Sequence, residues 1–127
     1  MLNCGVCGAG NLCNANVCEC GGVAFAAQIQ PIFTNTCAGA GCHGGVMPAE
    51  GLSLAAGRSF ASLVNVAASQ YANRLRVSPG APDRSYLMDK LRGVNLCFGT
   101  AMPKTRNIQQ ASIDLVGAWI CEGAPNN

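Results

Sequence analysis

The sequence predicts an all-α fold of about four short helices joined by long loops. Apolar residues recur at helical spacing in several segments, and alternating strand patterns are almost absent. Runs rich in Gly and Pro separate these segments. Long loops are uncommon in a compact chain of 127 residues, so we expect a cofactor to fill the space between the helices.

Two helices are predicted in the first half of the chain. Ile29 and Phe33 mark the first helix, with Pro31 near its start, where a missing amide N–H costs little. Ser59 is expected to cap the second helix, over residues 59–67, whose apolar side chains share one side. A Gly-rich loop separates these two helices.

Two further helices are predicted in the second half. The run VSPGAPD at residues 77–83 breaks the chain, and either Asp83 or Ser85 can cap the helix that follows it. The last helix carries a wide apolar stripe over residues 113–120 and is expected to end at Gly123.

The N-terminal segment differs in composition from the rest of the chain. It holds five cysteines among Gly, Asn and Ala, with almost nothing apolar that could build a core. We therefore divide the chain into a loop-rich, disulfide-stapled cap, residues 1–22, and a helical domain, residues 23–127. An odd number of cysteines cannot pair completely within the cap, so at least one is free, modified or bonded to another chain. The five are Cys4, Cys7, Cys13, Cys18 and Cys20.

Composition excludes several classes of protein. Half of the residues are apolar and 11% are charged, which argues against disorder. A net charge of +2 predicts no nucleic-acid binding, and no apolar stretch approaches the length of a membrane span. Nine cysteines with one histidine indicate an oxidising compartment, so we expect a periplasmic or extracellular protein. No signal sequence precedes Cys4, so the chain is expected to represent a mature form.

The most informative stretch is Cys37-Ala-Gly-Ala-Gly-Cys42-His43. Two thiols followed directly by an imidazole is the arrangement that attaches a haem, because each sulfur adds to a vinyl group and the histidine binds the iron. The usual spacing is two residues, but four Ala and Gly residues can loop out at little steric cost. Two alternatives stay open: a disulfide from Cys37 to Cys42 or to the cap, and a zinc site completed by a cap cysteine.

A second axial ligand must reach the opposite face of the haem. The chain offers Met1, Met47, Met88 and Met102. Met47 follows His43 by four residues, which span at most roughly 14 Å and leave too little chain to pass round the macrocycle. Met88 sits among apolar helix residues and is expected to fill the core. Met102 lies in a loop before Pro103, which fixes the backbone, and is our predicted ligand.

Several segments follow one another along the chain in an informative order: IQPIFTNTC, CHGG, GLSLAAGRSFASLVN, RVSPGAPDRSYLMDKL, AMP and IDLVGAWICEGAP. With these segments, residues 25–125 resemble the single-haem, class I-like cytochrome c domains of Gram-negative bacteria. The resemblance implies a cytochrome c-like fold around one covalently attached haem c. It implies that Cys37 and Cys42 form the thioethers and that His43 and Met102 are the proximal and distal ligands. It also implies that the first and last helices cross near Phe33 and Trp119.

Two other cysteines outside the cap are predicted to pair. Cys97 precedes Met102 by five residues and Cys121 ends the last helix, so we interpret them as a disulfide that stiffens the ligand loop.

Ligation by histidine and methionine leaves no open position on the iron, so the expected function is electron transfer with redox partner proteins, without enzymatic activity. One alternative is a haem-bearing subunit of an extracellular assembly or filament that self-associates through the cap. Another is a five-coordinate haem sensor or peroxidase, which requires Met102 to be absent from the iron.

Overall fold

The protein is described by a computed structural model that covers residues 11–14, 17–20, 23–38, 42–44, 48–69, 73–94, 96, 100–103 and 108–127. In the described part from residue 23 onward, α-helices and short helical turns are the regular structure, apart from single β-bridges between neighbouring loops. The prediction of an all-α domain is confirmed at this level.

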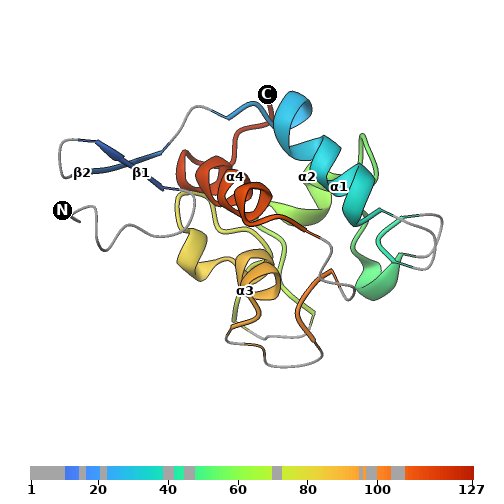
Figure 1. Cartoon of the computed structure of the whole chain (residues 1–127). Helices are drawn as coiled ribbons and strands as arrows, with labels where there is room; N and C mark the ends of the chain where they lie inside the picture. Colours follow the sequence, from blue (N-terminus) through green and yellow to red (C-terminus); the bar gives the residue numbers. More distant parts are fainter. Residues whose placement is uncertain are drawn as a thin grey trace.

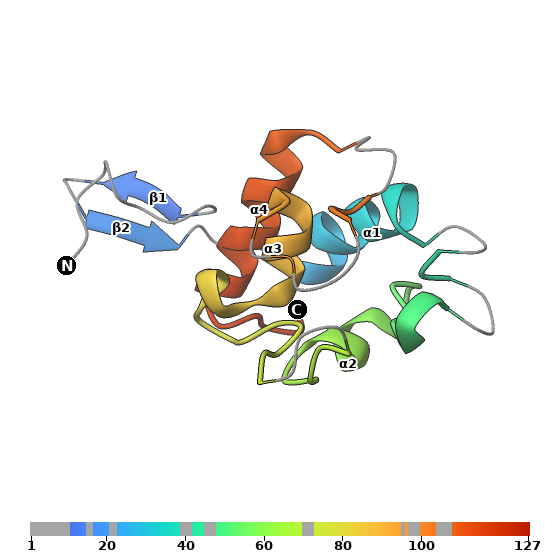
Figure 2. The same ribbon diagram turned by 90° about the horizontal axis from the view of Figure 1, so that it is seen from below.

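The cap contains a feature that the sequence did not predict. Strand β1, Asn11–Asn14, pairs with the antiparallel strand β2, Val17–Cys20, with Asn11 opposite Cys20. This hairpin lies to one side of the helical body, next to its last helix (Figures 1 and 2). A two-stranded hairpin is marginally stable alone, so contact with the helical body supports it. The side chains of its cysteines lie outside the described residues, and the predicted cap disulfides stay a prediction.

The first helix forms as predicted. A π-helical turn, Phe25–Ile29, leads into α1, Gln30–Thr36, with Pro31 in the first turn. The side chains of Ile29 and Phe33 are buried on its inner side.

The second helix is shorter than predicted, and its expected cap was wrong. Helix α2 spans Ser59–Leu63, and Arg58 occupies the N-cap position. Ser59 is instead buried inside the first turn, where its hydroxyl donates a hydrogen bond to the side-chain oxygen of Gln30 on α1. The helix stops early because Val64 is extended and forms a parallel bridge with Val77.

The last two helices lie side by side at the centre of the body (Figure 1). A short 3-10 turn, Pro82–Arg84, precedes α3, Tyr86–Arg92, and α4 spans Gln110–Cys121. Ser85 holds the N-cap position of α3, but its hydroxyl donates to the carbonyl of Ala81 rather than capping the helix. A further 3-10 turn, Ala49–Gly51, follows the histidine segment.

The core is centred on Trp119 of α4, which is 0% exposed. The ring that packs closest to it is Phe25, with ring centroids 4.9 Å apart, and Phe60 of α2 contacts both rings. Phe33 joins this cluster through Phe25, at a centroid distance of 6.2 Å. The last helix therefore meets the start of the first helical segment through Phe25. The indole Nε1 donates to the carbonyl of Pro125, 2.9 Å away, so its burial leaves no donor unsatisfied.

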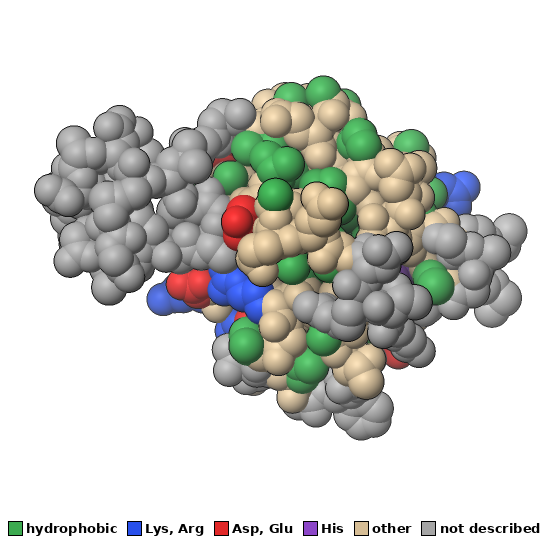
Figure 3. Space-filling model, viewed as in Figure 1, with side chains coloured by type: hydrophobic (Ala, Val, Ile, Leu, Met, Phe, Trp, Pro, Cys, Tyr) green, Lys and Arg blue, Asp and Glu red, His purple; other side chains and the backbone are tan. Residues whose placement is uncertain are grey.

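Apolar side chains are scattered over the face seen in Figure 3, and several acidic and basic side chains on that face lie together in a mixed group. One ion pair at the surface is Arg92–Asp83, at 3.0 Å. Among the helices that the structure describes, none combines the length and apolar character that crossing a bilayer needs.

The position of Trp119 generates a prediction about stability. Trp119→Ala removes the largest buried side chain and should lower the free energy of unfolding by about 3–5 kcal/mol, measured by denaturant titration with far-ultraviolet circular dichroism. Val94→Ala, at a side chain that is 44% exposed, serves as the control and should change stability by less than about 0.5 kcal/mol. Equal midpoints for the two variants would contradict this account of the core.

Candidate functional site

One cavity of about 270 Å³ brings together residues from most of the helical domain. Cys37, Cys42, His43 and Met102 all line it, so the four residues singled out in the sequence lie in one place. Its volume is near the lower end of the range for small-molecule sites, roughly 300 Å³. Cys42 is exposed, so the cavity opens to solvent at this side.

The loop after α1 holds Cys37 and His43 close together. Cys37 follows the last residue of α1, and its amide donates to the carbonyl of Phe33 at 2.8 Å. The amide of His43 in turn donates to the carbonyl of Cys37 at 3.1 Å. Residues 39–41 lie outside the described residues, so the course of the inserted Ala and Gly residues is a prediction.

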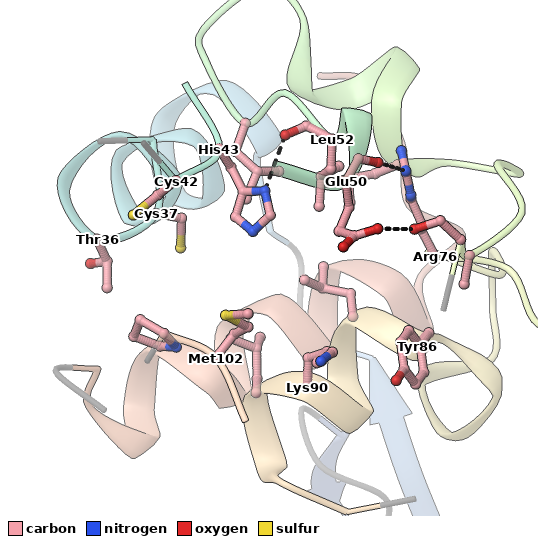
Figure 4. Close-up of a pocket in the computed structure, with 17 residues that line it drawn as sticks. Thr36, Cys37, Cys42, His43, Glu50, Leu52, Arg76, Tyr86, Lys90 and Met102 are labelled. Carbon is pink, nitrogen blue, oxygen red and sulfur yellow. Dashed lines mark hydrogen bonds between the residues drawn. The ribbon is translucent and has the colours of Figure 1, made fainter. Parts of the chain in front are cut away.

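The two thiols lie on the same side of the cavity (Figure 4). Both Cys37 and Cys42 are free, so the alternative disulfide between them is not formed. Burial raises the pKa of the Cys37 thiol to about 11, and the neighbouring Cys42 adds to the shift. At neutral pH the Cys37 thiol is therefore protonated and remains available on the cavity wall.

The imidazole of His43 is fixed from the segment that follows it. Nδ1 lies 3.1 Å from the carbonyl oxygen of Leu52, and the amide of Leu54 donates to the carbonyl of His43 at 2.7 Å. A carbonyl only accepts hydrogen bonds, so Nδ1 carries a proton, and in the neutral ring Nε2 keeps its lone pair. The Nε2 side of the ring faces across the cavity toward Met102 (Figure 4). This orientation suits a metal ligand. A histidine that binds a metal through one ring nitrogen commonly donates a hydrogen bond from the second, and that bond fixes the tautomer and the orientation of the ring.

Met102 comes from the opposite wall, on a short loop that contacts α3. Its amide donates to the carbonyl of Lys90 at 2.8 Å, and the ammonium group of Lys90 donates to the carbonyl of Thr100 at 3.0 Å. Met88 lies in the core at 0% exposure, in agreement with its predicted role as a core residue. Met1 and Met47 lie outside the described residues.

The end of the cavity away from the thiols is polar, which the sequence analysis missed. Arg76 donates through its two terminal nitrogens to the carbonyls of Ser62 and Glu50, each at 2.9 Å. Burial lowers the pKa of this guanidinium, and the charge of Glu50 acts in the opposite direction. Tyr86 lies at this end on the facing wall, and Lys90 lies between Tyr86 and Met102 (Figure 4). The available signal was the position of Arg76 directly before the VSPGAPD run and of Lys90 in the helix after it, in a chain in which only 11% of the residues are charged.

Two further predictions concern cysteines. Cys121 forms a disulfide, as predicted for this residue. Its proposed partner Cys97 lies outside the described residues, so the pairing itself stays a prediction.

Across the described ranges, no group of three or more His, Cys, Asp or Glu side chains is arranged to hold a metal ion. Cys37, Cys42 and His43 are thus not placed as three ligands of a zinc site.

Comparisons with known proteins do not assign the chain to a family. We compared it with protein-family models, with curated proteins and with solved structures, and none of these comparisons gave a match. The function is therefore argued from the cavity and the residues that line it.

Proposed function

We propose that the chain carries one covalently attached haem c in this cavity and transfers single electrons. The observation that supports the proposal most directly is the placement of four donor side chains around one space. The thiols of Cys37 and Cys42 lie on one side, while the imidazole of His43 and the thioether of Met102 face each other across it (Figure 4). These are the donor types that attach and ligate a c-type haem.

The walls of the cavity fit the same group. Leucine side chains form most of its apolar lining: Leu52, Leu54, Leu63, Leu87 and Leu91. At the polar end, the cation of Arg76 suits the carboxylates that a haem carries. Because Cys42 is exposed, the edge of the group beside it would remain open to solvent.

When bound, a haem supplies a one-electron iron couple, and a methionine ligand raises its reduction potential. The chain's own residues supply the rest. The carbonyl of Leu52 fixes the tautomer of His43, and leucine side chains would surround the group in the space between His43 and Met102. Hydrogen bonds that hold the imidazole of His43 and the backbone of Met102 would keep the change in structure on electron transfer small.

Electron transfer is favoured over a haem sensor or peroxidase by the position of Met102. A five-coordinate centre would need a free position across from His43, and the thioether of Met102 on the facing wall of the cavity would be available to fill it (Figure 4). His43 is also the only histidine in the sequence, so no second imidazole can serve as a distal base. Self-association through the cap depends on cysteine side chains of residues 1–22, which lie outside the described residues, and stays a prediction.

His43→Ala tests the proximal ligand. The variant should lose stable haem incorporation by at least about tenfold in a pyridine haemochrome assay, because the iron loses its anchored nitrogen. Its helical content should fall too, since the cavity walls would have nothing to pack around. A variant with native haem content would refute the assignment.

Met102→Ala tests the distal ligand. We expect the haem to remain attached, cyanide and carbon monoxide to bind, and the midpoint potential to fall by more than about 59 mV, the equivalent of tenfold for a one-electron couple. Met88→Leu is the matched control, since Met88 is a core residue, and it should leave the visible spectrum unchanged. An unchanged spectrum for Met102→Ala combined with an altered one for Met88→Leu would show that the ligand was misassigned.

A further inference from the structure

The Met102 loop is attached to the last turn of α3 at two adjacent points. The backbone carbonyl of Lys90 accepts the amide of Met102 at 2.8 Å, and the side-chain ammonium of the same residue donates to the carbonyl of Thr100 at 3.0 Å. One residue therefore bonds the loop on both sides of Ala101. We call this pair of hydrogen bonds the Lys90 clamp.

The side chain of Lys90 is unusually buried for a lysine, at 8% exposure. Burying an ammonium group is unfavourable by several kcal/mol unless hydrogen bonds and nearby electron-rich groups offset the loss of water. Here the carbonyl of Thr100 accepts from the ammonium, and the ring of Tyr86 lies 5.7 Å away. If the loop moved away, the ammonium would lose its bond to Thr100 inside a largely buried site, so loop opening carries an added free-energy cost.

A close approach of the backbone extends the contact beyond Lys90. Gly93 follows α3 in a left-handed conformation, with φ of 73°. A Cβ atom at this position would lie 3.2 Å from the Cβ of Ala101, which is tighter than an ordinary van der Waals contact. Glycine therefore lets the residue between Thr100 and Met102 pack directly against the end of α3.

Helix α3 is itself held in place by a buried ion pair. Asp89, at 1% exposure, accepts from Arg74, and the shortest distance between the two side chains is 2.7 Å. Arg74 also donates to the carbonyl of Asp83 at 2.7 Å, which ties the 3-10 turn before α3 to the same side chain. The helix that carries the clamp is thus fixed to the adjoining wall of the domain.

We propose that Lys90 is a positioning residue for Met102, and that its clamp sets how readily the methionine gives way to an external ligand. The inference rests on the proposed function. On the proximal side, attachment through Cys37 and Cys42 would keep His43 next to the iron whatever the loop does. On the distal side, the hydrogen bonds that Lys90 makes to Thr100 and Met102 are noncovalent, and the predicted Cys97–Cys121 disulfide would restrain the chain five residues before Met102. An external ligand can bind only when this loop has moved Met102 away. The apparent affinity for the external ligand therefore falls as the clamp makes loop opening less favourable.

The test is an imidazole titration of the haem-loaded ferric protein, followed in the visible spectrum. Lys90→Met keeps the length and apolar stem of the side chain but removes the bond to Thr100. We expect its apparent dissociation constant for imidazole to be at least about tenfold lower than that of the unmodified protein. Lys90→Arg retains a cationic donor and should stay within about threefold of the unmodified protein.

Arg92→Met is the matched control, because it removes a positive charge from the same helix at a residue that donates to Asp83, which precedes the helix. It should leave the imidazole affinity unchanged. If Lys90→Met gives too little haem-loaded protein, Lys90→Gln replaces it, since its side chain is too short to reach Thr100 and carries the same expectation. An affinity for Lys90→Met or Lys90→Gln equal to that of Arg92→Met would overturn the proposal.

Two measurements separate failure of the clamp from failure of the proposed function. Met102→Ala should bind imidazole more tightly than every other variant; if it does not, Met102 is not the ligand and both proposals fall. If Met102→Ala behaves as expected and Lys90→Met does not, only the clamp is wrong. In the unmodified protein, the Met102 amide should exchange its hydrogen far more slowly than an unstructured amide, and exchange at the unstructured rate would also overturn the clamp.

Discussion

The site depends on one constraint, which is that His43 and Met102 must face each other from opposite walls of a single cavity. Neither residue lies within a helix. Both are held by hydrogen bonds to backbone carbonyls of other segments, His43 by Leu52 and Met102 by Lys90. Backbone carbonyls are fixed once the chain has folded, so the carbonyl of Leu52 orients the imidazole of His43 and the carbonyl of Lys90 fixes the backbone of Met102. The helical core centred on Trp119 matters to the site because it sets the positions of these carbonyls.

The wall of the cavity that holds His43 and the wall that holds Met102 are built in different ways. A substitution elsewhere in the domain would therefore affect them differently. The histidine wall is local: Cys37, His43, Leu52 and Leu54 are joined by short-range hydrogen bonds after α1. The methionine wall depends on α3, which in turn depends on the ion pair between Asp89 and Arg74. A perturbation far from the cavity, at Arg74 for example, can therefore reach Met102 through α3, whereas the route to His43 is much shorter.

The sequence was sufficient for the parts of the molecule that depend on local chemistry. The Cys37 to His43 stretch and Met102 could be singled out because their residue types carry a known ligand chemistry, and the structure places all four side chains on one cavity. Pro31 marked the start of α1 correctly, and the apolar stripe marked α4. These features can be read from a short window because neighbouring residues determine them.

Contacts between distant segments could not be predicted in the same way. Ser59 has the side chain of a helix cap, but its hydroxyl bonds to Gln30 because α1 happens to pack there. Helix α2 ends early because Val64 bridges to Val77, a pairing that no local pattern reveals. The cap hairpin was missed as well, since its strands lack the alternation of apolar residues that marks a half-buried sheet.

The placement of charge links these observations to function. Only 11% of the residues are charged, yet Glu50, Arg76 and Lys90 all line the cavity. Glu50 remains exposed, but Arg76 is partly buried and Lys90 is buried, so the loss of hydration of these two cations must be offset. The offset is visible for the two cations, because Arg76 bonds to the carbonyls of Ser62 and Glu50, and Lys90 bonds to that of Thr100. Each of these bonds also ties together loops that border the cavity, so both cations hold its walls in place, and Arg76 also suits an anionic group.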